Sequence, residues 1–242
     1  MTFSGSGIYK KVLVGAASCF MALGAQAVTL ETLVGTTITY VYDKDQAAVA
    51  LFGEPILVGD TVVFTPLNFR AESTNGAPGS DVVSANFVFE NVYANDANAW
   101  IDSINVSEEG DYRIDTDGYV SVDLRLQGST NSGSTFGRGV DTASFSSSGD
   151  SGGIQEWGTL SASLSGSDIV DPFSGESVGP QNSLTIGIQN NLTAITDANG
   201  ETAWVEKKLN FTAVSAVPLP AAAWLFGSAM IGLLAVGRRR KA

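Results

Sequence analysis

Histidine is absent from this chain of 242 residues, and cysteine occurs once, at Cys19. Without histidine the chain cannot build a Ser-His-Asp triad, a Cys-His nucleophile pair or the usual zinc sites. Carboxylates, lysine, tyrosine, serine and threonine are the only side chains left for acid, base or nucleophilic roles. The composition therefore favours a protein that is not an enzyme.

Basic residues are also scarce, with 13 Lys and Arg against 25 Asp and Glu and a formal charge of −12. Six of the basic residues lie in segments 1–27 and 217–242, so residues 28–216 carry 7 basic and 25 acidic residues, a formal charge of −18. Such a charge repels nucleic-acid phosphates and attracts divalent cations. We expect no nucleic-acid partner and no cofactor, with Ca²⁺ left open.

The first 27 residues have the three parts of a secretory signal. Lys10 and Lys11 precede an apolar stretch over residues 12–23, and Ala25-Gln26-Ala27 forms an A-x-A cleavage site. Cleavage by signal peptidase would make Val28 the first residue of the mature chain and remove Cys19, leaving no disulfide. Lipidation at Cys19 is the alternative, although residues 16–18 lack the usual large aliphatic residue.

The C-terminal segment, residues 217–242, predicts a membrane span. Its first 21 residues are uncharged, and as a helix they would be about 30 Å long, which matches the bilayer core. The basic cluster Arg238, Arg239, Arg240 and Lys241 follows at once and should stay in the cytoplasm. We therefore expect an inner-membrane-anchored precursor with the body outside.

The order of motif, span and basic end resembles the PEP-CTERM sorting domain of Gram-negative bacteria. The motif here is Val217, Pro218, Leu219 and Pro220, where the usual form has Glu between the prolines. The resemblance covers only residues 217–242. It implies recognition by an exosortase, removal of the tail, and delivery to the cell surface or to the exopolysaccharide matrix of a biofilm.

Residues 28–216 predict one all-β domain, an antiparallel sandwich of about eight to ten strands, with jelly-roll topology left open. Apolar and polar residues alternate, as in Val120, Val122, Leu124 and Leu126. The same alternation occurs at Ile38-Tyr40-Tyr42, Val83-Ala85-Phe87-Phe89, Leu160-Ala162-Leu164 and Leu184-Ile186-Ile188.

Turn residues separate these runs. Gly53-Glu54-Pro55 and Val58-Gly59-Asp60 predict a short strand between them, and residues 115–118 predict a hairpin turn between residues 112–114 and 119–121. The last strand is expected near residues 202–212. Residues 128–153, of which 15 of 26 are Gly or Ser, predict a long mobile surface excursion with a weak strand over residues 140–145.

Two groups of residues could bind a ligand. Asp115 and Asp117, followed by Gly118, resemble the start of a calcium loop, although Asp-Gly is equally typical of a tight turn. Trp100, Trp157 and Trp204 could form a platform for sugar rings or could lie in the core. Trp204 alternates with Glu206 and Lys208, which favours an outward or rim position for it.

Three functions remain open. The first is a structural or adhesive protein of the exopolysaccharide layer, and the second is a carbohydrate-binding module, with or without Ca²⁺. The third is a glycoside hydrolase, for which two carboxylates at the required separation would be needed. The available glutamates are Glu54, Glu90, Glu108, Glu109, Glu156 and Glu206.

Overall fold

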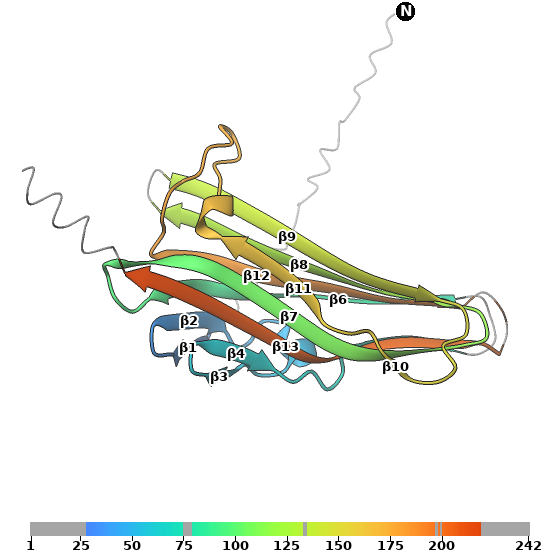
Figure 1. Ribbon diagram of the computed structural model, residues 1–242. Coiled ribbons are helices and arrows are strands. Elements are labelled where there is room, and N and C mark those ends of the chain that lie inside the picture. Colours follow the sequence, from blue (N-terminus) through green and yellow to red (C-terminus); the bar gives the residue numbers. More distant parts are fainter. Residues whose placement is uncertain (1–27, 75–78, 133–134, 197, 199, 219–242) are drawn as a thin grey trace, which may run out of the picture.

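The computed structural model describes residues 28–74, 79–132, 135–196, 198 and 200–218. In these ranges the chain forms two antiparallel sheets packed face to face, with long strands that give an elongated body (Figure 1). Only the short helix α1 (Val49–Phe52) and the 3-10 turn η1 (Gly166–Asp168) interrupt the strands there. The predicted all-β sandwich is confirmed, whereas the signal peptide and the tail helix fall outside the described residues.

The first sheet contains six strands. Their order is β1 (Leu30–Val34), β2 (Ile38–Asp43), β6 (Gly79–Ala94), β12 (Ser183–Thr196), β8 (Tyr119–Ser132) and β9 (Thr135–Ser148). The short strand β1 and the Gly-rich and Ser-rich strand β9 form its two edges.

The second sheet contains seven strands. Their order is β10 (Gln155–Glu156), β7 (Ala99–Asp115), β13 (Thr202–Pro218), β4 (Thr61–Phe64) and β3 (Ile56–Val58), with β11 (Leu160–Ser165) also paired to β7 and β5 (Arg70–Thr74) to β13. The total exceeds the predicted eight to ten, and a strand as short as β10, with two residues, is too short to show alternation.

The core lies between the sheets, where the inward residues of the alternating strands meet. Val120, Val122, Leu124 and Leu126 are all buried, which confirms the predicted face of β8. Five aromatic rings fill the centre in edge-on or tilted contacts, with centroid separations between 4.7 and 6.2 Å: Tyr40, Phe52, Phe64, Phe87 and Phe89. Such contacts are the preferred geometry of packed aromatic side chains.

The turn at residues 115–118 was wrongly predicted to form a hairpin. β7 belongs to the second sheet and pairs with β13, whereas β8 belongs to the first sheet and pairs with β12 and β9. The turn therefore crosses from one sheet to the other, with Thr116 at a φ of 72°. Alternation identifies the buried face of each strand but not its partner strand. The alternating pattern therefore could not show that β7 and β8 belong to different sheets.

The prediction of a mobile excursion over residues 128–153 was also wrong. β8 and β9 pair along their whole length, with Gly128 opposite Gly139. The glycines are needed for space, because a Cβ at Gly139 would lie 2.7 Å from the carbonyl oxygen of Asp168, and one at Gly128 would lie 2.9 Å from Cδ1 of Ile169. Ile169 is only 1% exposed, so the glycines let the loop after β11 pack against the sheet.

The last strand is longer than predicted. β13 continues to Pro218, with Val217 opposite Trp100 and Pro218 opposite Ala99. The first two residues of the tail motif are thus paired to β7, and no linker separates them from the sandwich. Among the described residues no helix has the length and apolar character needed to cross a bilayer.

Candidate functional site

The sorting residues are described only in part. Val217 is half-buried and Pro218 is exposed at the end of β13, whereas Leu219, Pro220 and the basic cluster at 238–241 lie outside the described residues.

The three body tryptophans do not form one platform. Trp204 lies in the outward phase of β13, as expected, but is only 7% exposed because the Arg70 guanidinium covers its ring at 4.2 Å from the centroid. Trp157 is 6% exposed, and its Nε1–H donates a hydrogen bond of 3.0 Å to the Glu206 carbonyl oxygen. Both rings are occupied by protein contacts and offer little surface to a sugar.

Trp100 differs from the other two. It is half-buried on the outer face of β7 and lines a surface depression together with Asp102, Ser167 and Pro180. An aromatic face beside a carboxylate and a hydroxyl is a combination that sugar-binding surfaces can use.

The structure gives the proposed calcium residues no further ligands. Asp115 accepts a 2.7 Å hydrogen bond from Nε of Arg113, and Asp117 lies in the turn between the sheets. In the described ranges, no three Asp or Glu side chains lie close enough together to hold one metal ion.

Three carboxylates line another surface depression, Glu109, Asp111 and Glu156. Asp111 is bonded to Lys208, and Glu109 accepts a 2.9 Å hydrogen bond from the Thr159 hydroxyl. Glu108, another of the glutamates available for a glycosidase, is fully buried and cannot reach a dissolved glycan.

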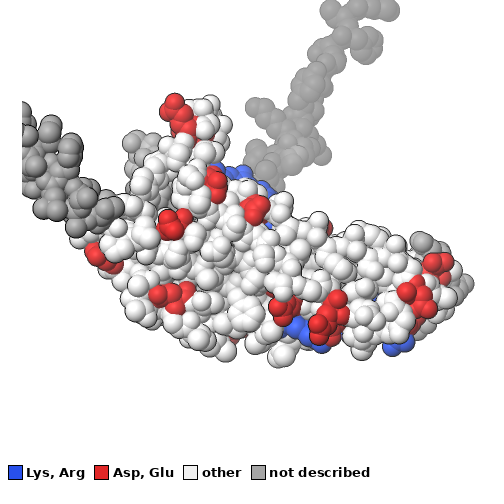
Figure 2. Space-filling view, in the orientation of Figure 1, with Lys and Arg blue, Asp and Glu red and all other residues white. Residues whose placement is uncertain are grey.

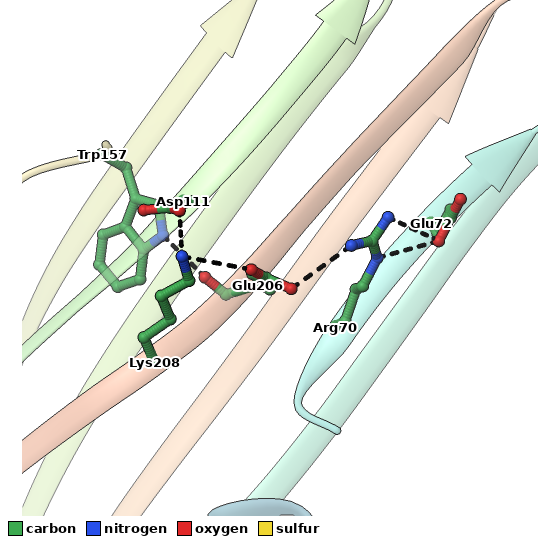
Figure 3. A network of polar contacts seen from close by, with 6 residues as sticks. All are labelled: Arg70, Glu72, Asp111, Trp157, Glu206 and Lys208. Carbon is green, nitrogen blue, oxygen red and sulfur yellow. Dashed lines mark hydrogen bonds and ion pairs between the residues drawn. The ribbon is translucent and has the colours of Figure 1, made fainter. Parts of the chain in front are cut away.

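An outer ionic row crosses the solvent face of the second sheet (Figure 3). It comprises Glu72 and Arg70 on β5, Glu206 and Lys208 on β13, and Asp111 on β7. Arg70 bridges Glu72 at 2.8 Å and Glu206 at 3.4 Å, and Lys208 bridges Glu206 at 3.6 Å and Asp111. The row joins three neighbouring strands at the surface.

A second polar cluster lies inside the sandwich, where no solvent reaches it. Glu108 on β7, Asn190 on β12 and Lys207 on β13 are each 0% exposed, so the cluster spans both sheets. Nζ of Lys207 lies 2.5 Å from Oε2 of Glu108 and 2.5 Å from Oδ1 of Asn190. Nδ2 of Asn190 donates to both carboxylate oxygens of Glu108, at 2.7 and 2.9 Å. We call these three residues the buried triad.

Lys207 points inward in the same phase as Ala203 and Val205, and a β-bulge follows it directly. On β13, Lys207 pairs with Gly110 and Leu209 pairs with Glu109, so Lys208 is the extra residue and points to solvent. Gly110 is required here, because a Cβ would lie 2.0 Å from the Glu206 carbonyl oxygen and 2.5 Å from Nε1 of Trp157.

The surroundings of the Lys207 amine are aromatic. Nζ lies 4.5 Å from the centroid of Phe52 and 5.7 Å from that of Phe69. Burial lowers the pKa of Lys207, and the nearby Glu108 carboxylate opposes that shift only in part. Asn210 completes the cluster with a long contact of 3.4 Å from its Nδ2 to Glu108, while its Oδ1 accepts from Thr212.

The sequence analysis did not identify the buried triad as a site, although its signal is present. Glu108 follows Ile104 and Val106 in the inward phase of β7, and Asn190 follows Ile186 and Ile188 in the inward phase of β12. Lys207 likewise follows the inward residues Ala203 and Val205. Polar residues in the apolar phase of three strands indicate a buried polar cluster.

Comparisons with known proteins give no family. No family model matches the sequence, and no curated protein matches it. Among solved structures, a chain from the structure of infectious bursal disease virus Gt strain aligns at 14% identity and a TM-score of 0.11, covering 77% of this chain and 53% of that chain. This chain thus spans about half the length of that one, and so low a score supports no common fold.

Proposed function

We propose that this chain is an exported protein of the cell surface or extracellular matrix, sorted through its C-terminal tail and structural or adhesive in the exopolysaccharide layer. The observation that carries the proposal is the sequence of residues 217–242, with its proline motif, apolar span and terminal basic cluster. Signal peptidase and an exosortase would process the two ends, and the precursor would be held in the inner membrane between these steps.

The body has properties that suit such a role. Its long strands form an elongated sandwich, and acidic side chains are dispersed over the face seen in Figure 2 with few basic ones among them. A strongly acidic surface keeps an extracellular protein soluble and repels other polyanions at low ionic strength. The body would thus act as a hydrated spacer or scaffold.

The continuity of β13 with the tail supports the same proposal. Because Val217 and Pro218 are paired to β7, a force applied at the tail acts directly on the long central strands of the second sheet. Attachment at this point would load strands that are hydrogen-bonded along most of their length. That arrangement suits a protein that is held at one end.

Carbohydrate binding is the second candidate, and the depression at Trp100 is the observation that favours it. Titration of isolated exopolysaccharide with the Trp100→Ala variant would test it. Loss of binding with unchanged stability would support a sugar site, and Trp204→Phe serves as the control because Trp204 is covered by Arg70.

Intact-mass analysis of the protein recovered from the cell surface and the medium tests the sorting proposal. We expect an N-terminus at Val28 and a C-terminus near residues 217–220. A Pro220→Ala variant should accumulate as a longer, membrane-bound form if the motif is read by a processing enzyme. Secreted protein that still carries residues 238–242 would refute the proposal.

A further inference from the structure

The buried triad places an amine, a carboxamide and a carboxyl group in mutual contact inside the core. Its residues come from β7, β12 and β13, and all three are 0% exposed. Each polar atom of the triad bonds mainly to the other two side chains. The cluster therefore has no route by which it could bind a dissolved ligand, and any chemistry must occur within the protein.

Stability alone does not explain why this cluster is present. Removing two charges from water costs several kcal/mol per ion, and apolar residues of similar volume often serve as well or better. The surroundings are already aromatic, with Phe52 and Phe69 beside the Lys207 amine. Residues 28–216 contain only 7 basic residues, and burying Lys207 removes one of these few positive charges from the surface.

We propose that Lys207 and Asn190 form an intramolecular isopeptide bond, with Glu108 as the proton-transfer group. In this reaction Nζ of Lys207 bonds to Cγ of Asn190, and the Cγ–Nδ2 bond of Asn190 breaks. The products are a Lys-Asn amide and one molecule of ammonia. No oxidant, reductant or other reactant is needed, because the carboxamide supplies the acyl group and its own amine is the leaving group.

The positions of the atoms suit this reaction. Nζ lies 2.5 Å from Oδ1 of Asn190, and since a C=O bond is about 1.2 Å long, Nζ lies less than about 4 Å from the carbon that it would attack. Groups held at such a separation react as if at effective concentrations of about 10⁵ to 10⁸ M when they are well oriented. The inward phase of Lys207 on β13 and the backbone hydrogen bond of 2.9 Å from Lys207 N to the Phe69 carbonyl oxygen fix the direction of the side chain.

Glu108 contacts both the attacking and the leaving nitrogen. Oε2 lies 2.5 Å from Nζ of Lys207, so the carboxylate can accept the proton that makes the amine nucleophilic. The same carboxyl group lies 2.7 Å from Nδ2 of Asn190 and can return the proton to the departing nitrogen. Nζ gives up a second proton to Glu108 as the new amide forms, so the departing nitrogen leaves as neutral ammonia and Glu108 ends protonated, which balances atoms and charges. Burial also lowers the pKa of Lys207, which increases the share of neutral amine.

The bond would join the two sheets covalently. Asn190 lies in the first sheet and Lys207 in the second, and the two residues are 17 positions apart in the chain. Residues 28–218 contain no cysteine, so no disulfide can do this. The bond would also secure β13, the strand that leads into the tail, against a pulling force.

Digestion of the full-length protein with a protease that cleaves after glutamate tests the proposal. Glu201 and Glu206 lie between Asn190 and Lys207, so complete cleavage puts the two residues on different peptides. We expect one branched species that contains both peptides and is lighter than their sum by one ammonia. Recovery of the two peptides only as separate linear species would overturn the proposal, and so would loss of ammonia from the Asn190 peptide without attachment of the Lys207 peptide.

Matched variants test the role of each residue. Lys207→Met, Asn190→Ala and Glu108→Gln should each abolish the branched species, whereas Lys208→Met should retain it. A branched species in Glu108→Gln at the wild-type level would overturn the role of Glu108. The result for the unaltered protein is decisive even if a variant fails to fold.

Discussion

Lys207 and Lys208 are neighbours on β13, yet they occupy opposite environments. Lys208 is half-exposed and belongs to the outer ionic row, whereas Lys207 is fully buried and belongs to the buried triad. Exposed ion pairs contribute little because water and salt screen them, while a buried pair depends entirely on its partners. The comparison shows that the face of β13 on which a lysine lies decides whether it has a minor or a major effect on this protein.

The largest expected difference follows from removing each lysine in turn. Lys207→Met leaves Glu108 in the core without the Lys207 nitrogen, which is a cation before the proposed bond forms and part of the cross-link afterwards, and we expect the free energy of unfolding to fall by about 3–5 kcal/mol. Lys208→Met should lower it by less than about 1 kcal/mol. Urea denaturation followed by tryptophan fluorescence measures both. Equal losses in the two variants would contradict the proposed difference between the environments.

The bulge itself can be tested at Gly110. An alanine Cβ there would meet the Glu206 carbonyl oxygen at 2.0 Å, so β7 and β13 would have to separate. We expect Gly110→Ala to cost about 1–3 kcal/mol of unfolding free energy, as overpacking usually does. Gly187→Ala is the control on β12, because its Cβ would meet Asn86 only at an ordinary contact of 3.4 Å. If the control lost as much stability, crowding at the bulge would not be the cause.

Asp60 lies between the buried and exposed extremes. Its carboxylate is partly buried, and among the described residues its partners are neutral hydrogen-bond donors. Burial raises its pKa, but hydrogen bonds from the backbone and hydroxyl of Thr37 and the backbone of Ile38 outweigh burial and lower the pKa below 3.8. Its stabilising effect is therefore complete above the pKa of the unfolded chain and is lost as the pH falls through the lower folded value.

Asp60→Asn should remove this effect. We expect a loss of about 1 kcal/mol at neutral pH, which shrinks as the wild-type carboxyl becomes protonated. Urea midpoints of both proteins from pH 7 down to acid pH measure the change. A difference that stayed constant across this range would show that the charge of Asp60 is not involved.

The smallest effect on stability is expected at Arg70. Arg70→Ala breaks two partly exposed ion pairs, so the loss should stay below about 1 kcal/mol and decrease further in high salt. The same change uncovers Trp204, so quenching of tryptophan fluorescence by acrylamide should increase. Arg113→Ala is the control, since Arg113 pairs with Asp115 at the surface. An unchanged quenching in Arg70→Ala would mean that Arg70 does not shield the ring.

Much of the fold could be predicted from alternation and turn residues. The inward faces of β2, β8 and β12 and the short strand β3 between its two turns are as expected. Strand pairing could not be predicted in the same way, and residues 115–118 connect two sheets instead of forming a hairpin. Local sequence sets the turn, whereas the partners of β7 and β8 depend on β12 and β13, which lie far along the chain.

The glycine-rich strand β9 and the buried triad escaped prediction for related reasons. Gly128, Gly137 and Gly139 suggested a flexible loop, but they serve the close approach of Ile169 and Val178, which follow later in the chain. Lys207 continues the inward phase of Ala203 and Val205, but its partners Glu108 and Asn190 lie on other strands, so the sequence does not show that the three side chains meet. In both cases a contact between distant segments overrides the local pattern.

A crystal structure of the protein at high resolution tests the central claim most directly, namely that the buried triad is reactive. We predict continuous electron density between Nζ of Lys207 and Cγ of Asn190, planar geometry at the new amide, and no density for Nδ2. Separate Lys207 and Asn190 side chains at hydrogen-bond distance, in protein whose chain is otherwise intact, would contradict it.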